Sequence, residues 1–319
     1  MSITERIALL GIIPVIKISN AADAVPLCGA LMRGGLPVAE ITFRTDAAEA
    51  AIQNVSAAMP DMLVGAGTVL TTDQVDRALG AGAKFIVSPG LNPEVVLHCI
   101  ARGVPIFPGC ATAGEIERAL SLGIKTVKFF PAEAMGGISS VKALSAPYGD
   151  VRFIPTGGIN EDNINDYLSF GKVIACGGSW MVSEALVNGG DFDAIERKTR
   201  AAVQKMLGFE LKHIGLNMNG KDEADAAVNT FEKLFGWAVI PGASGSFAGT
   251  AIEAMNAPNY GTHGHIAVGC NSIERARDYL ERLGVLFIAE SLKEKNGVPF
   301  VIYMKDEIGG FAVHLLNKK

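Results

Sequence analysis

The sequence predicts an α/β protein in which a (β/α)8 barrel is followed by a smaller α+β domain. Short apolar runs occur eight times between residues 12 and 178, and their starts lie 20 to 25 residues apart. Each interval has room for one strand, one amphipathic helix and two short loops. The pattern changes after residue 208, and four of the five histidines follow that point.

The eight runs are continuous rather than alternating in apolar character. Strands of this kind are buried on both faces, as in a parallel sheet covered by helices. Eight βα units in about 200 residues fit a compact TIM barrel, with an open doubly wound sheet as the alternative. The expected strands are 12–17, 37–43, 62–68, 84–90, 104–109, 126–131, 151–158 and 172–178, and the last helix of the barrel is expected over 191–207.

The remaining residues predict two βαβββ modules in tandem. A first strand, a helix and further strands are expected between residues 209 and 255, and the same order is expected again between 263 and 317. Such an internal repeat indicates one unit of structure used twice. The expected domains are therefore a barrel over 1–208 and an α+β domain over 209–319.

Composition excludes several classes of protein. The 319 residues include 28 Lys and Arg against 33 Asp and Glu, a net charge of −5, which gives no electrostatic footprint for nucleic acid or an anionic membrane. No apolar stretch reaches the ~18 residues that a membrane span needs, and no secretory signal is evident, so we expect a cytoplasmic protein. The five cysteines form no CxxC pair, which indicates small buried hydrophobes rather than disulfides or a zinc ribbon.

Lys128 is the strongest indication of catalysis. It lies between Val127 and Phe129 inside the apolar run 126–131, where a charged side chain has no structural reason to be. Burial disfavours an ammonium, and a neutral amine can attack a ketone to form a carbinolamine and then an imine. A lysine that reaches solvent from a strand end is the alternative. Its place within the run favours a Schiff-base lysine.

A Schiff-base enzyme also needs an acid–base group to dehydrate the carbinolamine and to move protons beside the imine. Glu40 is the candidate, because it lies in an apolar setting near the end of the run 37–43. A purely structural ion pair with Arg44 is the alternative role for this carboxylate. Arg44 and Thr68 follow at the same rim of the barrel, where a guanidinium could clamp a substrate carboxylate and a hydroxyl could donate to it.

Glycine pairs follow the seventh and eighth runs, in the segments 156–158 and 177–179. Glycine lets the backbone approach a ligand closely, and amide N–H groups at helix starts bind anions. In (β/α)8 barrels a phosphate site commonly forms from these two loops, although two ordinary tight turns would also explain the glycines.

In combination, the strings AEITFRT, GAGTV, IVSPG, VKFFPAEAMGG, FIPTGGI and GGSW resemble the class I 2-keto-3-deoxy-6-phosphogluconate (KDPG) and 4-hydroxy-2-oxoglutarate (KHG) aldolases over residues 3–207. The resemblance implies cleavage of KDPG to pyruvate and glyceraldehyde 3-phosphate without a metal, in a homotrimer. It implies these roles: Lys128 as the Schiff-base lysine, Glu40 as the general acid–base, Arg44 and Thr68 as holders of the pyruvyl carboxylate, Pro89 and Phe130 as pocket walls, Thr156 on the substrate hydroxyl, and Gly157, Gly158, Gly178 and Ser179 on the phosphate.

Several alternatives stay open for the barrel. Relatives also cleave KHG to pyruvate and glyoxylate, and others act on the galactonate-derived phosphate ester. Thr156 favours the gluconate-derived ester, since the matching residue in the family is associated with recognition of the substrate hydroxyl. A phosphosugar isomerase or epimerase would share the phosphate loops without needing a buried lysine in the sixth strand. A catalytically inactive phosphate-binding barrel is a further alternative.

Residues 211–317 carry a second candidate site. His213, Glu253, His265 and His314 lie in β-like runs at the first and last strands of the two modules. Imidazole and carboxylate suit a first-row divalent ion. The segment resembles the glyoxalase-like (vicinal oxygen chelate) family, which implies that these four residues bind a metal, although His314 stands where a glutamate is usual. The domain is expected to be either a metal-dependent module or a non-catalytic binding or oligomerisation module.

Overall fold

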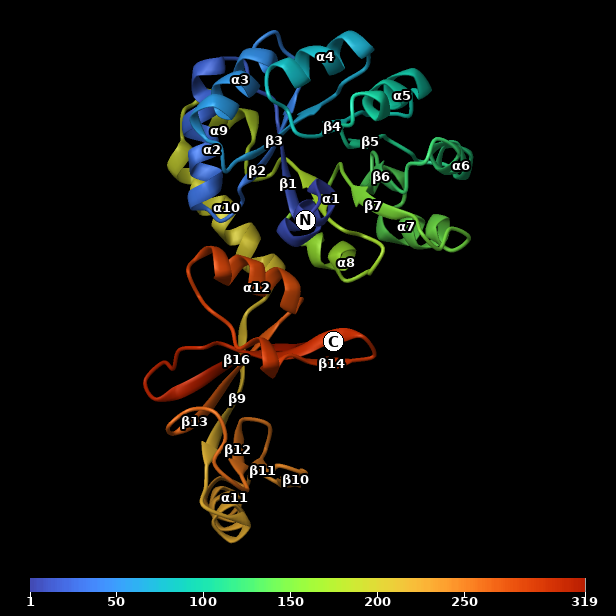
Figure 1. Ribbon diagram of the computed structural model, residues 1–319. Coiled ribbons are helices and arrows are strands. Elements are labelled where there is room, and N and C mark those ends of the chain that lie inside the picture. The colour runs from blue at the N-terminus through green and yellow to red at the C-terminus, as the bar shows by residue number, and fades with distance from the viewer. Residues whose placement is uncertain (319) are drawn as a thin grey trace. The chain divides into compact units, whose positions relative to one another are not determined.

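The computed structural model describes residues 1–318 and divides the chain into two compact units, Met1–Met206 and Leu207–Lys319. Figure 1 shows helices arranged around strands in the first unit and helices beside a sheet in the second. We describe each unit by itself.

Eight parallel strands form the wall of the first unit, which confirms the predicted barrel. Six of these strands form one sheet in the order β5-β4-β3-β2-β1-β8, and β6 and β7 form a second sheet of two strands. Isolated parallel bridges from Gly109 to Lys128 and from Thr156 to Gly177 join these two sheets into a closed ring. The strands are β1 (Ile12–Ile16), β2 (Val38–Thr42), β3 (Leu63–Gly67), β4 (Ile86–Val87), β5 (Ile106–Phe107), β6 (Thr126–Phe129), β7 (Arg152–Pro155) and β8 (Cys176–Gly178).

Some helices of this unit begin where the sequence supplies a capping side chain. Thr112 and Glu115 form a capping box at the start of α6, and the Asn92 side chain caps α5, whose first residue is a proline. The helices that follow the strands are α2 (Ala24–Arg33), α3 (Ala48–Ala58), α4 (Thr72–Gly80), α5 (Pro93–Ala101), α6 (Ala113–Ser121), α7 (Gly137–Ser145), α8 (Ile164–Leu168), α9 (Glu184–Asn188) and α10 (Phe192–Leu207), with short 3-10 turns η1 (Ala21–Asp23) and η2 (Glu133–Met135).

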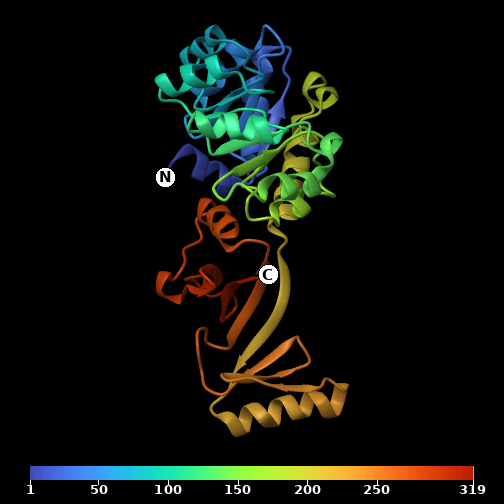
Figure 2. The same cartoon turned by 90° about the vertical axis from the view of Figure 1, so that its right-hand side faces the viewer.

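One further helix, α1 (Ile3–Leu10), precedes the first strand and was not expected from the sequence. Ser2 and Glu5 form a capping box at its start, and Gly11 ends it in the left-handed conformation. Ile7 and Leu10 are buried in one cluster with side chains from several barrel strands. Figure 2 shows α1 at one end of the barrel, so this helix closes the mouth at which the strands begin.

The second unit has the two βαβββ modules that the sequence predicts. The first contains β9 (Glu210–Asn217), α11 (Lys221–Phe235), β10 (Val239–Pro241), β11 (Gly245–Ala248) and β12 (Ile252–Met255). The second contains β13 (Gly264–Cys270), α12 (Ile273–Arg282), the 3-10 turn η3 (Ala289–Ser291), β14 (Lys293–Lys295), β15 (Val298–Tyr303) and β16 (Phe311–Asn317).

The two modules form a single eight-stranded sheet in the order β10-β11-β12-β9-β13-β16-β15-β14. The first strands of the modules, β9 and β13, pair antiparallel at its centre, and each also pairs parallel with the last strand of its own module. Equivalent positions of the two modules therefore face each other across the central strand pair.

The burial of the cysteines agrees with the prediction from sequence. All five cysteines are free and buried, and burial raises the pKa of the Cys28, Cys99, Cys110 and Cys270 thiols to about 12. Within residues 1–318, no helix is long and apolar enough to span a bilayer.

The position of α1 predicts that truncating its apolar face destabilises the barrel. Leu10→Ala removes a side chain that is only 1% exposed, and such core truncations cost about 2–5 kcal/mol. Urea unfolding monitored by circular dichroism should show this loss in the barrel transition. Leu97→Ala, at a helical leucine that is 53% exposed, is the matched control and should change stability by less than about 0.5 kcal/mol. Equal effects of the two substitutions would contradict the closing role of α1.

Candidate active site and candidate metal centre

A buried lysine–carboxylate pair lies at the centre of the barrel. Lys128 on β6 and Glu40 on β2 are 4% and 2% exposed, and Lys128 Nζ lies 3.4 Å from Glu40 Oε1. The Phe130 ring lies over the same ammonium, with its centroid 5.3 Å from Nζ. Buried charges are retained in proteins when they are paired or functional. Contact between Nζ and a carboxylate oxygen gives a path for moving a proton between the two groups.

Gly67 leaves the space that the Glu40 side chain occupies. A Cβ on Gly67 would lie 2.2 Å from Glu40 Oε1 and 2.6 Å from its Cγ, closer than van der Waals contact allows. Residue 67 ends β3, which pairs with β2 in parallel register. The side chain of Glu40 is enclosed, so it has little freedom to move away from an added methyl group. A glycine at this position is therefore part of what sets the direction of the carboxylate.

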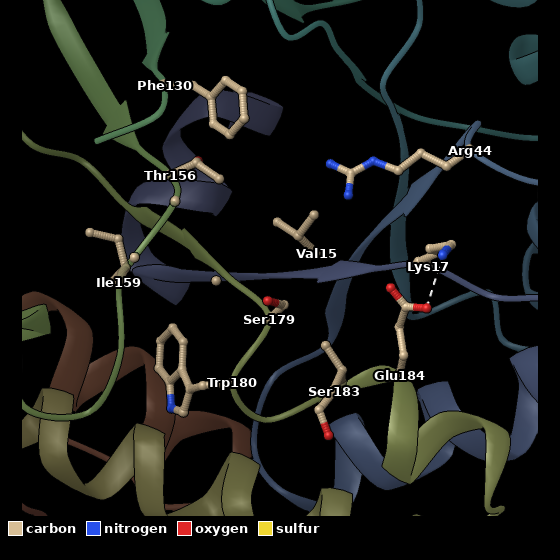
Figure 3. Close-up of a pocket in the computed structure, with 14 residues that line it drawn as sticks. Val15, Lys17, Arg44, Phe130, Thr156, Ile159, Ser179, Trp180, Ser183 and Glu184 are labelled. Atoms are coloured by element: carbon tan, nitrogen blue, oxygen red, sulfur yellow. Dashed lines mark hydrogen bonds and ion pairs between the residues drawn. The ribbon is translucent and has the colours of Figure 1, made fainter. Parts of the chain in front are cut away.

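Arg44 and Thr68 meet at the rim, as the sequence predicts for a carboxylate clamp. Arg44 Nε donates a hydrogen bond to Thr68 Oγ1 over 3.2 Å. Thr68 has a φ of +57°, and a β-branched residue in the left-handed region is a strained outlier that costs on the order of 1–3 kcal/mol. Strain of this kind persists where surrounding structure fixes it, commonly at functional sites. The guanidinium of Arg44 points into the pocket (Figure 3).

A pocket of about 540 Å³ opens at the ends of β1, β7 and β8. It contains seven of the residues singled out from the sequence, which are Arg44, Phe130, Thr156, Gly157, Gly158, Gly178 and Ser179. Lys128 and Glu40 are not among its lining residues and connect to it through Phe130. Pro89 does not line it either, and its carbonyl lies instead against Gly109.

The loop that carries Gly157 and Gly158 is supported from the neighbouring segment. Both glycines have positive φ, +99° and +79°, a conformation that other residues rarely adopt. The backbone N–H groups of Ala132 and Glu133 donate to the carbonyls of Thr156 and Gly157. Glu133 in turn accepts a hydrogen bond from the Tyr167 hydroxyl. These contacts fix the loop with its backbone facing the pocket.

Sequence reasoning did not identify four polar or aromatic residues of this pocket, Lys17, Trp180, Ser183 and Glu184. Lys17 directly follows β1, and its Nζ lies 2.9 Å from Glu184 Oε2 (Figure 3). The signal that could have found Lys17 is its place at the end of the first strand, because groups at strand ends line the active sites of (β/α)8 barrels. Glu184 gives no comparable signal, since it lies beyond the loop after β8.

The four histidine and glutamate candidates of the second unit lie on one face of its sheet. Strand register places Glu253, Gly215 and His265 side by side on β12, β9 and β13. The row two residues along contains His213 on β9, opposite Ala267 on β13. His314 on β16 pairs with that same alanine. Residues two apart on a strand share a face, so the two rows converge.

Gly215 makes room within this cluster, and the sequence analysis did not identify it. A Cβ there would lie 2.0 Å from His265 Cε1. The cluster is enclosed by aromatic rings, with Phe247 5.4 Å from the His213 ring and Tyr303 4.6 Å from the His314 ring, measured between centroids. Phe247 and Tyr303 pair with Glu253 and His314 on the adjacent strands.

Short distances join three of the four candidate ligands, and a ring nitrogen of His314 lies within 4.8 Å of ring nitrogens of His213 and His265. Glu253 Oε2 lies 3.4 Å from His213 Nε2 and 3.2 Å from His265 Nε2, and these two nitrogens are 3.1 Å apart. Burial works to raise the pKa of Glu253, but hydrogen bonds from both histidines lower it to about 2. Burial and the nearby His265 and His213 lower the pKa of His314 to about 3. At neutral pH the cluster therefore offers a carboxylate and a neutral imidazole.

The fold and the first site together define a class of protein. A closed (β/α)8 barrel holds a buried lysine against a carboxylate, an arginine at the rim and glycine loops after its last two strands. This arrangement is that of a barrel enzyme acting on small carbonyl compounds through lysine.

Comparison with known proteins identifies the family. The model of the KDPG and KHG aldolase family matches residues 3–198, so the chain belongs to this family. A 2-dehydro-3-deoxy-phosphogluconate aldolase from Treponema pallidum is 48% identical over 204 residues, which are 64% of this chain and 97% of that protein. A KHG/KDPG aldolase from Escherichia coli K12 is 40% identical over 193 residues, which are 60% of this chain and 91% of that protein.

A solved structure agrees in fold. The KDPG aldolase from Legionella pneumophila, captured with pyruvate as a covalent carbinolamine intermediate, has a TM-score of 0.61 and 39% identity. The match covers 62% of this chain and 97% of the chain of that aldolase. The family match ends at residue 198, before the second unit begins at Leu207.

The packing of Gly67 against Glu40 gives a prediction for activity. Gly67→Ala should displace the carboxylate and lower the rate of pyruvate release from KDPG by on the order of 100-fold, since small misplacements of reacting groups have effects of this size. Gly80→Ala is the control, because a Cβ at the end of α4 meets nothing within 4 Å. Circular dichroism should show that both variants fold. Full activity in Gly67→Ala would mean that the position of Glu40 is not critical.

Proposed function

We propose that the barrel cleaves KDPG to pyruvate and glyceraldehyde 3-phosphate through a Schiff base on Lys128. The single observation that carries this proposal is the buried pair of Lys128 and Glu40, with Nζ 3.4 Å from Oε1. An isomerase or epimerase barrel has no need of such a pair. The activities named for the relatives in Treponema pallidum and Escherichia coli support the same choice.

The reaction begins with a proton transfer. Glu40 takes a proton from Lys128, and the free amine adds to the C2 carbonyl to give a carbinolamine. Loss of the C2 oxygen as water, with a proton supplied by Glu40, leaves a protonated imine. The C3–C4 bond then breaks as Glu40, acting through a water molecule, takes the proton of the C4 hydroxyl. The electron pair of that bond moves to the imine to form an enamine, and C4 leaves as the aldehyde carbon of glyceraldehyde 3-phosphate. Protonation at C3 and hydrolysis release pyruvate and restore the amine.

The pocket residues supply binding and orientation. Arg44, held by Thr68, would pair with the C1 carboxylate, and Phe130 would wall the reacting carbons. The amides of Gly157, Gly158, Gly178 and Ser179 would bind the phosphate, as glycine loops do in other barrels. Thr156 would contact a substrate hydroxyl, which favours the gluconate-derived ester over the galactonate-derived one.

Cleavage of KHG to pyruvate and glyoxylate is a second activity of the same site. The Escherichia coli relative named as a KHG/KDPG aldolase supports it. The same Schiff-base steps apply to both substrates, because the keto acid end is identical. A cytoplasmic location and assembly as a homotrimer belong to the same proposal, since they come from the composition and the family resemblance.

Borohydride trapping tests the covalent step. Reduction in the presence of pyruvate should leave a stable pyruvyl adduct on the peptide that contains Lys128, because hydride fixes the imine carbon. Peptide mass spectrometry locates the adduct. Lys128→Ala should abolish it, while Lys84→Ala, at an exposed lysine two residues before β4, should leave it unchanged.

Two results would overturn the proposal. One is an unmodified Lys128 peptide in the native protein. The other is an adduct that persists in Lys128→Ala. An isomerase, an epimerase or an inactive phosphate-binding barrel each predicts no trapping.

We propose, as a second function, that the other unit binds one first-row divalent ion through His213, Glu253, His265 and His314. Two ligand atoms at ~2.1 Å from a tetrahedral ion lie about 3.4 Å apart. The atoms of Glu253, His213 and His265 are separated by 3.1 to 3.4 Å, close to that value. The observation that favours an ion is the environment of His314, which is 5% exposed and whose two ring nitrogens have no hydrogen-bond partner among the described residues. A lone pair on one of them would point to a ligand rather than remain unpaired.

When bound, an ion at this site would act as a Lewis acid toward an oxygen atom that it takes as a fifth ligand beside the four protein side chains. The protein residues would hold the ion and exclude water, since Phe247 and Tyr303 flank the ligands. The alternative for this unit is a non-catalytic binding or oligomerisation module, which needs no ion.

Metal analysis separates the two roles. Protein purified without chelators and measured by inductively coupled plasma mass spectrometry should contain about one transition-metal ion per chain, since four convergent N and O ligands suit such ions. His213→Ala and His265→Ala should lose it, whereas His263→Ala, at an exposed histidine outside the cluster, should retain it. Metal-free protein with full aldolase activity would favour the non-catalytic module.

A further inference from the structure

One ion pair in the aldolase pocket has no role in the chemistry at Lys128. Lys17 and Glu184 line the same pocket as the glycine loops, with Lys17 Nζ 2.9 Å from Glu184 Oε2. Their side chains are 38% and 58% exposed, so the pair stands at the mouth. An ion pair this exposed contributes little to stability, because water screens both charges. Structural need is therefore a weak explanation for placing two charges there.

The topology places Lys17 between the two anion-binding ends of the pocket. β1 lies between β2 and β8 in the sheet, and Arg44 and Ser179 follow those two neighbours. Pro14 on β1 pairs with Gly178 on β8, so Lys17 and Ser179 leave adjacent strands in the same direction. Figure 3 shows Lys17 and Glu184 joined beside Arg44, on the side of the pocket that also contains Ser183.

The charges that line the pocket indicate a role for the Lys17–Glu184 pair in binding the phosphate. The phosphate of the proposed substrate carries close to two negative charges at pH 7, whereas the glycine loops offer only amide dipoles. Lys17 and Arg44 are the two cationic side chains among the residues that line this pocket, and Arg44 is hydrogen-bonded to Thr68. Glu184 is the one anionic lining residue, and it would repel a phosphate.

We propose that Lys17 and Glu184 determine which substrate is preferred. They distinguish substrates by the charge and the length of the substrate end that lies remote from the keto acid group. When a phosphorylated substrate binds, the ammonium of Lys17 exchanges its carboxylate partner for the phosphate. Glu184 holds Lys17 when the pocket is free and lowers the affinity for phosphate by competing with it. The five-carbon substrate KHG ends at a carboxylate on C4 and does not extend to this position. This inference rests on the proposed function, because it assigns the phosphate end to the glycine loops.

The two variants should move specificity in opposite directions. Lys17→Met should lower the ratio of kcat/KM for KDPG to that for KHG by roughly tenfold, the effect of losing one charge-assisted contact. Glu184→Gln should raise the same ratio by roughly twofold to fivefold, because it frees Lys17 and removes a repulsive charge. Inorganic phosphate, used as a competitive inhibitor of KDPG cleavage, should bind more weakly to the first variant and more tightly to the second.

Controls separate this role from a structural one. Lys125→Met breaks a more exposed pair with Asp150 before β6, outside the pocket, and should leave the ratio unchanged. If the pair only fastened the loop after β8, both pocket variants would lower the ratio together. That result, or an unchanged ratio in Lys17→Met, would overturn the inference. Borohydride trapping of pyruvate should persist in every variant, so loss of trapping would indicate failure of the Schiff-base proposal instead.

Discussion

The barrel depends functionally on one interaction, the contact between the buried ammonium of Lys128 and the buried carboxylate of Glu40. Either charge alone would be expensive at this depth, and breaking such a pair by removing one partner costs about 3–5 kcal/mol. Each of the two charges therefore lowers the free-energy cost of burying the other. It also sets the chemistry, because a proton moved across the 3.4 Å contact turns an ion pair into a neutral amine and an acid.

The same principle of enclosure operates in the second unit with different groups. Glu253 and the histidines share a polar cluster surrounded by Phe247 and Tyr303, and the two modules contribute equivalent strands to it. In both units a glycine provides space for a functional side chain, Gly67 beside Glu40 and Gly215 beside His265. A methyl group at either place would collide with the group that it now accommodates.

Much of the architecture was predictable, because the pattern of apolar residues along the chain indicates which faces of the strands are buried. Eight continuous apolar runs indicated parallel strands, and the structure places a strand within each, although β4 and β5 keep only two residues of regular pairing. Helix α1 was missed, since its apolar residues merge with those of β1 across Gly11 and only the capping box at Ser2 marks its start. For the second unit, the sequence predicted the repeat of two modules but not the order of the strands in the sheet.

Residues of the site were predictable where a charged side chain lies within an apolar stretch of the sequence. A lysine in an apolar strand is conspicuous, and so is a glutamate, which is why Lys128 and Glu40 could be identified from sequence. Lys17 was missed although it directly follows β1, because a charged residue after a strand is ordinary. Glu184 could not be found, because its meeting with Lys17 depends on the closure of β8 onto β1. Gly215 could not be found either, since its importance comes from strand register rather than from local sequence.

Pyruvate release by one preparation, supplied separately with KDPG and with KHG and compared as kcat/KM, tests the role of the buried Lys128–Glu40 pair. We expect cleavage of both, with the higher value for KDPG because its phosphate gains contacts at the glycine loops and Lys17. Release of pyruvate from neither substrate by folded protein would contradict the assignment of Lys128 and Glu40 as an aldolase pair.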